Sequence, residues 1–147
     1  GDDSIFMQLC MKNKNCKVSY SAHKNSYVLA KTHLNWKDLI IQRIRWAGDA
    51  NIMWKYNKLL YLISISTFYS NLLFILLLLF STNYYIFFTL LFIKYFFEYL
   101  LYILSCKKLN QKINNILFQL WFILQIPYIV IVGSGSFYAS NLKWKGR

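Results

Sequence analysis

The distribution of apolar residues divides this chain into a polar N-terminal part and a C-terminal part rich in long hydrophobic stretches. No charged residue occurs from Leu59 to Ile93, a run longer than the roughly 20 apolar residues that one helix needs to cross a bilayer. The polar sequence Ser-Thr-Asn at 81–83 interrupts this run. We therefore predict that residues 58–105 form a transmembrane hairpin, with spans at about 59–81 and 84–105 joined by a very short turn.

A third hydrophobic stretch covers residues 113–138, and Pro127 and the Gly-Ser-Gly-Ser sequence at 133–136 interrupt it. Basic residues precede the first span, follow the second and close the chain, and the positive-inside rule places all of them in the cytoplasm. They are Arg43, Arg45, Lys55 and Lys58; Lys107, Lys108 and Lys112; and Lys143, Lys145 and Arg147. The stretch is too short for two crossings of about 20 residues each. The pattern therefore favours an interfacial or re-entrant helix over a simple third span, followed by a basic tail within residues 106–147.

Residues 35–57 have the pattern of an amphipathic helix that lies at the membrane interface. Asn35 is a favourable N-cap residue, and Asp38 follows three positions later, as in a capping box. Gly48 is a candidate point of interruption. The apolar side chains cover about one half of the helical wheel, and the tryptophans among them favour the bilayer interface. This half comprises Trp36, Leu39, Ile40, Trp46, Ala47, Met53 and Trp54.

Residues 1–34 are predicted to be the C-terminal end of a soluble domain. The apolar positions within 3–11 have helical spacing, whereas residues 17–21 alternate as Lys-Val-Ser-Tyr-Ser, which is typical of a short strand. Polar residues at 13–15 and 22–34 are expected to form a turn and a loop. Because the sequence begins Gly-Asp-Asp without an initiating methionine, we expect the C-terminal part of a longer protein.

The composition supports a membrane location. Hydrophobic residues make up 57% of the chain and the mean hydropathy is +0.33, both high for a soluble domain. The formal net charge is +12, but the basic residues flank the hydrophobic stretches, so anionic lipid explains them better than nucleic acid does. The cysteines are too few for a disulfide framework or a zinc site, and His23 and His33 lack metal-ligand spacing, so we expect reduced thiols and no metal ligands here.

The most informative polar sequence is Gln42-Arg43-Ile44-Arg45-Trp46, within the predicted interfacial helix. Gln42, Arg45 and Trp46 lie at i, i+3 and i+4 and share a face, whereas Arg43 points toward the apolar side. An amide, a guanidinium fork and a flat ring are suited to hold a diphosphate and to stack against a sugar. The alternative is an amphipathic anchor whose arginines snorkel to the lipid headgroups.

Two further groups of charged residues are candidate sites. Asp2 and Asp3 lie at the predicted start of the first helix, where they act either as a helix cap or as a general base for an acceptor hydroxyl. Lys94 and Glu98 lie four residues apart in the second span, where each unpaired charge costs about 2.5–3.5 kcal/mol on insertion scales. This pair is expected either to face a glycan or headgroup path or to pack against a helix outside this chain.

The order of these features resembles the C-terminal portion of membrane-integrated family 2 glycosyltransferases, the group that includes cellulose, chitin and hyaluronan synthases. Residues 42–46 match their Gln-x-x-Arg-Trp signature, and Ala47 continues the cellulose-synthase-like form. Residues 1–3 are similar to their acidic motif, and Trp-Lys-Gly-Arg at 144–147 is similar to the Trp-containing motif of their cytoplasmic gating loop. The resemblance spans essentially the whole chain. It implies a mainly α membrane segment joined, at residues 1–34, to the tail of a GT-A-like α/β catalytic domain.

The resemblance implies roles for the residues around the signature. Gln42 and Arg45, assisted by Arg43, would bind the diphosphate of a nucleotide-sugar donor. Trp46 would form part of the platform for the acceptor, a glycan or a lipid-linked sugar.

The resemblance also implies which residue is the catalytic base and which metal ion the protein binds. Asp3, beside Asp2, would take the proton of the acceptor hydroxyl as it attacks the anomeric carbon with inversion. Trp144 and Arg147 would belong to a gating-loop-like motif. Mg²⁺ or Mn²⁺ would be bound through an Asp-x-Asp motif upstream of this sequence. The expected location is the bacterial inner membrane, with the catalytic side and the C-terminus cytoplasmic and no nucleic-acid partner.

The chain departs from the family in three respects. No Asp-x-Asp occurs, so we expect the nucleotide-binding half to lie upstream and this chain to be inactive alone. Gly146 stands where the gating motif of cellulose synthases carries a threonine, and two clear spans are few for a secretion channel. Transfer of one sugar is therefore as reasonable an expectation as processive polysaccharide synthesis. The rival hypothesis is a non-enzymatic membrane adaptor with a basic juxtamembrane helix, for which Gln42 has no special importance.

Overall fold

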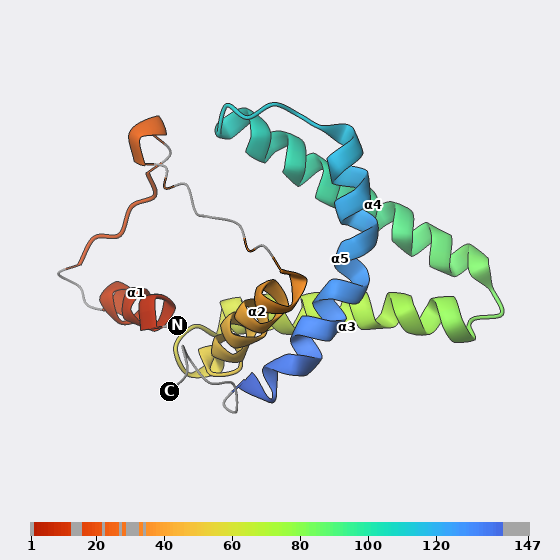
Figure 1. Ribbon diagram of the computed structural model, residues 1–147, viewed down its shortest axis with the longest axis horizontal. Coiled ribbons are helices and arrows are strands. Elements are labelled where there is room, and N and C mark those ends of the chain that lie inside the picture. The colour runs from red at the N-terminus through yellow and green to blue at the C-terminus, as the bar shows by residue number, and fades with distance from the viewer. Residues whose placement is uncertain are drawn as a thin grey trace. The chain divides into compact units, whose positions relative to one another are not determined.

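The computed structural model describes residues 2–12, 16–21, 23–26, 28, 33 and 35–139, and its regular elements are helices (Figure 1). In chain order these are α1 (Asp2–Lys12), η1 (Lys24–Ser26), α2 (Trp36–Ala50), η2 (Met53–Lys55), α3 (Lys58–Phe80), α4 (Tyr84–Lys108) and α5 (Asn115–Ser136). The predicted mainly α class is confirmed. The chain divides into two compact units, residues 1–68 with 131–147 and residues 69–130.

The predicted strand at residues 17–21 is wrong. These residues are exposed and have no regular secondary structure, and no strand occurs anywhere in the described part of the chain. Alternating polarity is sufficient for a strand only when a second strand accepts its backbone hydrogen bonds. An α/β character for residues 1–34 is therefore not seen in the described residues.

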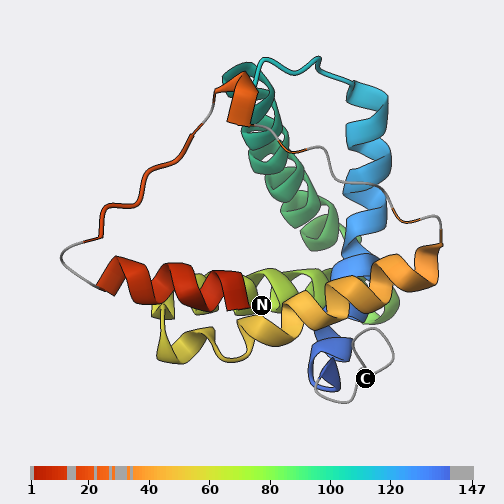
Figure 2. The ribbon, with the colours of Figure 1, turned by 60° about the vertical axis from the view of Figure 1, so that its left-hand side comes forward.

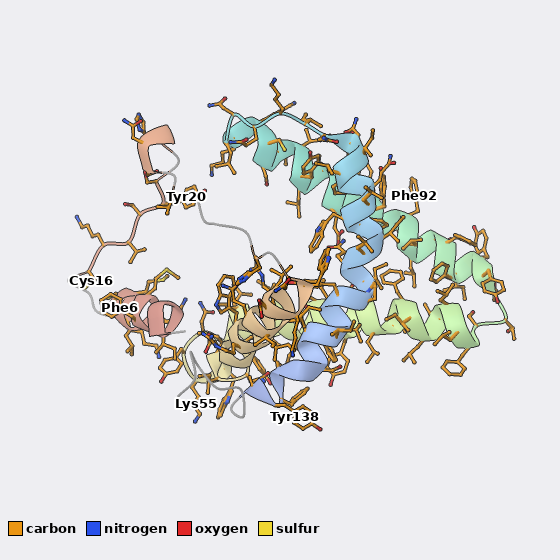
Figure 3. The ribbon with its side chains drawn as sticks, viewed as in Figure 1. Phe6, Cys16, Tyr20, Lys55, Phe92 and Tyr138 are labelled. Atoms are coloured by element: carbon orange, nitrogen blue, oxygen red, sulfur yellow. The ribbon has the colours of Figure 1, made fainter. Side chains whose placement is uncertain are left out.

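Three of the described helices, α3, α4 and α5, are long and apolar enough to cross a membrane. They contain 23, 25 and 22 residues, so each exceeds the length of about 30 Å that the bilayer core requires. Most of their large apolar side chains are exposed; Phe92, which projects from α4 in Figure 3, is 69% exposed. Such a surface is stable in lipid and not in water, which indicates an integral membrane protein.

The predicted hairpin is confirmed as two helices, α3 and α4, separated by residues 81–83. The turn is closed by its own polar side chains. Asn83 accepts a hydrogen bond from the backbone N–H of Tyr85 and so caps α4, while the Ser81 hydroxyl donates to the Asn83 carbonyl at 3.1 Å. Next to the turn, the rings of Phe74 and Phe87 meet edge to face at 6.2 Å.

The third stretch forms one continuous helix. Proline 127 lies inside α5 and removes one backbone donor, yet the helix continues to Ser136. Proline is tolerated in membrane helices because neighbouring groups satisfy the freed carbonyl. Residues 115–136 are thus a single helix without an internal reversal, and its placement at the interface stays a prediction.

Within the unit of residues 69–130, α4 packs on the first half of α5 through contacts between aromatic rings. Tyr95 contacts Phe122 at 5.1 Å, and Tyr102 contacts Phe118 at 5.0 Å between ring centroids. The Tyr102 hydroxyl also accepts the backbone N–H of Asn114 at 2.7 Å. The partners run in opposite chain directions, so these two segments form an antiparallel helical pair.

The same pair contains the two intramembrane charges. The Lys94 ammonium is ion-paired with Glu98, and the Gln125 side-chain amide donates to the other carboxylate oxygen of Glu98. Lys94 also lies 4.9 Å from the centre of the Phe122 ring. The pair was expected either to face a glycan or headgroup path or to pack against a helix outside this chain. The structure shows that it packs against a helix, but this helix is α5 of the same chain.

In the other unit, α2 begins where the sequence predicts and ends earlier. Asn35 is its N-cap residue, although its side chain faces the Asp38 carboxylate at 3.5 Å and does not cap the backbone. The helix continues through Gly48 to Ala50, and the backbone N–H of Asn51 turns back to the Gly48 carbonyl. The predicted helix over 35–57 is therefore too long by two turns.

Small residues let α2 and the end of α5 approach closely (Figure 2). A Cβ at Gly48 would lie 2.5 Å from the Cβ of Ala139, and one at Gly135 would lie 2.6 Å from Cδ1 of Ile44. Glycine at such positions permits helix backbones to pack closely. The face of α2 used here carries Ile44 and Gly48, not the tryptophans of the predicted apolar half, of which Trp36 is 75% exposed.

Candidate functional site

The Gln-x-x-Arg-Trp sequence lies in the middle turns of α2. Gln42, Arg43 and Arg45 are half-buried, and Trp46 is 49% exposed. The Arg43 guanidinium lies 4.4 Å above the Trp46 ring, which is a favourable distance for a cation–π contact. The structure therefore pairs Trp46 with Arg43, the arginine that the helical wheel had placed on the apolar side.

Arg45 belongs to a different environment, a polar pocket of about 440 Å³ at the C-terminal ends of α2 and α5. Its walls are Arg45, Gly48, Asp49, Asn51, Ser136, Phe137 and Ala139. Neither Gln42 nor Trp46 lines this pocket. Gln42, Arg45 and Trp46 therefore share a face of α2, as predicted, but of the three only Arg45 lines the pocket.

Side-chain hydrogen bonds hold the two walls of the pocket together. The Asn51 amide nitrogen donates to the carbonyl oxygen of Ser136 at 3.3 Å and to its hydroxyl at 3.2 Å. The Ser136 hydroxyl donates in turn to the carbonyl of Gly133 at 2.6 Å, and Ser136 is only 7% exposed. Asn51 therefore satisfies a carbonyl at the end of α5 that would otherwise lack an intrahelical partner.

The pocket contains both signs of charge. Arg45 supplies a permanent cation and Asp49, one helical turn later, supplies a carboxylate, while Asn51 and Ser136 add neutral polar groups. Phe137, which is 72% exposed, adds an aromatic ring. Such a set can hold a ligand that combines an anionic group with hydroxyls and an apolar face.

Most of the residues that line this pocket carry no recognisable signal in the sequence. The pattern of the sequence assigns no role to Asp49, and it marks the Gly-Ser-Gly-Ser sequence at 133–136 only as an interruption. The available signal was the set of small residues at Gly48, Gly133 and Gly135, a composition that favours close helix packing.

The remaining candidates are placed only in part. Asp2 and Asp3 are the first residues of α1, as predicted for a helix N-terminus, but their side chains lie outside the description, as does Gly1. Trp144 and Arg147 lie outside the described residues. Within the described part of the chain, no group of three or more His, Cys, Asp or Glu residues is arranged to hold a metal ion.

One cysteine has an altered acidity. Desolvation raises the pKa of the Cys10 thiol, and the neighbouring Cys16 raises it further. Cys10 therefore stays protonated at neutral pH, and a protonated thiol is a poor nucleophile. The surroundings of Cys10 therefore do not activate its thiol as a nucleophile.

No protein-family model, curated protein or solved structure matches this chain. The assignment of function therefore rests on the helices and the pocket.

Proposed function

We propose that this chain is the membrane segment of an inverting glycosyltransferase that takes its sugar from a nucleotide-diphosphate donor. The observation that carries the proposal is the position of Arg45, which belongs to a Gln-x-x-Arg-Trp sequence and lines a polar pocket. The helix that carries it directly precedes helices long and apolar enough to cross a membrane. Chemistry at the membrane surface accounts for both features together.

In this proposal the leaving diphosphate gains negative charge as the glycosidic bond breaks. Arg45 stabilises that charge with charge-assisted hydrogen bonds, and the Gln42 amide adds a neutral donor. Trp46 contributes a flat surface for the acceptor sugar. Asp3, beside Asp2, takes the proton of the acceptor hydroxyl, which attacks the anomeric carbon from the face opposite the diphosphate.

The nucleotide and the divalent cation are assigned to residues outside this sequence. The sequence has no Asp-x-Asp, and the described residues do not fit a site for Mg²⁺ or Mn²⁺. The acceptor is a glycan or a lipid-linked sugar, and the proposed location is the bacterial inner membrane with α2 on the cytoplasmic side, where its cations fit the positive-inside rule.

The direct test is sugar transfer by the membrane-embedded protein with its nucleotide-binding domain. Arg45→Ala removes one charge-stabilising donor and is expected to lower turnover by about 100-fold or more. Lys37→Ala is the matched control, because it removes a cation from the exposed first turn of the same helix. Near-normal turnover in Arg45→Ala would refute the assigned role.

The alternative is a non-enzymatic adaptor held at an anionic lipid surface. The observation that favours it is the exposed pairing of cations with aromatic rings, Arg43 over Trp46 and Lys55 at 5.6 Å over Trp54. Such pairs are suited to the headgroup region of a bilayer. An adaptor of this kind binds the lipid surface through charge alone, so replacement of the neutral Gln42 should not affect its function.

A further inference from the structure

We propose that α1 is a membrane-binding helix that lies in the headgroup region of the bilayer, with its exposed apolar face against the acyl chains. This outer face comprises Phe6, Met7, Leu9 and Met11. The inference goes beyond the proposed function and does not depend on it, because it concerns only how α1 contacts lipid. It assigns to the bilayer a helix for which the sequence pattern predicts the end of a soluble domain.

The polar side chains of α1 face the protein. After its first turn the helix has two of them, Gln8 and Lys12, which lie four residues apart and share a face. Gln8 is only 5% exposed, and its side-chain oxygen accepts a hydrogen bond from the Asn57 amide at 3.0 Å. The Lys12 ammonium lies 5.6 Å from the centre of the Tyr56 ring. All four residues belong to the same compact unit, so these contacts define the inner face of α1.

The outer face of α1 is apolar and exposed. Phe6, which is labelled in Figure 3, is 69% exposed, and Met7, Leu9 and Met11 are exposed as well. A helix on the surface of a soluble domain has the reverse arrangement, with apolar side chains toward the protein and polar side chains toward water. The inverted arrangement is unfavourable in water, and it becomes favourable where the outer face meets lipid.

The residue that holds α1 also marks its level relative to the bilayer. Asn57 directly precedes α3, and its side-chain oxygen accepts the backbone N–H of Leu60 at 3.0 Å, as an N-cap does. The helix that it caps is long and apolar enough to cross a membrane. One amide therefore caps this helix and holds α1 beside its start. With 11 residues, a length of about 16 Å, α1 is too short to cross the bilayer but suited to lie in its interface.

The segment that contacts α1 has the composition of a bilayer interface, which favours lipid over another protein as the occupant of the outer face. Tyr56 lies beneath the Lys12 ammonium, and in the same segment the Lys55 ammonium lies 5.6 Å from the centre of the Trp54 ring. Tyrosine, tryptophan and lysine are typical of the headgroup level. Directly after this segment, Leu59 is exposed at the start of α3. The lipid contact expected for α3 therefore continues onto the outer face of α1.

The test measures the depth of spin labels on single cysteines, with the full chain in phosphatidylcholine nanodiscs and a cysteine-free background. Phe6→Cys and Leu9→Cys report on α1, Leu62→Cys is the lipid reference on α3, and Asn25→Cys in the exposed η1 is the water reference. Collisions with dissolved oxygen report lipid, and collisions with a water-soluble nickel chelate report water. We expect both α1 labels to lie about 5–10 Å into the boundary between headgroups and acyl chains. Labels as accessible to nickel as Asn25→Cys, or shielded from both reagents by protein, would overturn the inference.

Substitutions on the outer face identify the cause of the lipid contact, with Met11→Cys carrying the spin label. Phe6→Gln combined with Leu9→Gln removes two apolar side chains, adds no charge and keeps good helix formers, so the label should move from lipid to water. Val18→Gln combined with Tyr20→Gln is the matched control, because it alters two exposed apolar residues outside α1 and should leave the depth unchanged. An unchanged depth in the outer-face variant, or an equal loss in the control, would contradict the inference.

Discussion

At the scale of single residues, Arg43 and Arg45 have different surroundings although they are two positions apart on α2. Arg43 stacks over the exposed Trp46 ring, whereas Arg45 lines the polar pocket. An exposed cation–π pair contributes about 0.5–1 kcal/mol, and lipid headgroups can provide the rest of its environment. We therefore assign the proposed diphosphate contact to Arg45 and the proposed interfacial contact to Arg43.

Gly48 is the residue whose size most directly controls the pocket. In Gly48→Leu the new side chain meets Ala139, which has no flexible end that can move away, so overpacking of about 1–3 kcal/mol is expected. The better helix propensity of leucine offsets about 1 kcal/mol of this cost. Thermal unfolding in detergent should show a lower Tm.

Gly135→Ala is the control for this prediction. Its new methyl group meets the flexible end of the Ile44 side chain, which can rotate, so its effect should be smaller. A Tm for Gly48→Leu equal to or above that of Gly135→Ala would contradict the packing described for this seam.

At the scale of the elements, α4 and the first half of α5 are joined by one polar cluster within an apolar, aromatic contact. Glu98 accepts from both Lys94 and Gln125, and Gln125 is buried. The two donors satisfy both carboxylate oxygens in a medium that offers no other hydrogen-bond donors. This cluster fixes the register of the two helices.

Gln125→Leu should loosen that helical pair, because it leaves one carboxylate oxygen of Glu98 without its donor. Hydrogen bonds between membrane helices contribute on average about 0.6 kcal/mol, with a maximum near 1.7 kcal/mol, and a loss in this range is expected. Denaturation by SDS in bicelles measures it. Gln119→Leu, at an exposed position of the same helix, should be neutral or stabilising, and an equal loss in both variants would refute the role of the cluster.

The sequence was most informative where a signal is local. The charge-free run and its polar turn predicted α3 and α4, and Asn35 predicted the start of α2, because hydropathy and capping act over a few residues. The continuity of α5 through Pro127 was not predicted, since it depends on neighbouring groups. In the site, spacing predicted Arg45 but not Ser136, which is 85 positions from its partner Asn51.

At the scale of the whole molecule, the C-terminal end of α5 belongs to the same compact unit as α2. Ser136 is hydrogen-bonded to Asn51. We therefore propose that the residues after α5 lie on the side of the membrane that carries α2. The basic residues at 143–147 agree with this placement, because the positive-inside rule assigns them to the cytoplasm together with those of α2. We therefore expect that α5 does not deliver the C-terminus to the opposite side of the membrane.

Labelling of single cysteines in a cysteine-free background tests this topology. Tyr138→Cys follows α5 at an exposed position labelled in Figure 3, and it should react from the same side as Lys55→Cys. Thr82→Cys, in the exposed turn between α3 and α4, should react from the opposite side. Reaction of Tyr138→Cys together with Thr82→Cys would show that α5 crosses the bilayer and would contradict the proposed placement.

The central claim is that α2 binds a diphosphate by specific geometry and not an anionic surface by charge. The most direct measurement is sugar transfer by Gln42→Ala, compared with Lys37→Ala, in the protein with its nucleotide-binding domain. We expect that loss of the neutral amide lowers turnover by about tenfold or more, whereas loss of the exposed cation changes it little. A silent Gln42→Ala, with impaired membrane binding in Lys37→Ala, would contradict the account and favour an adaptor that reads lipid charge.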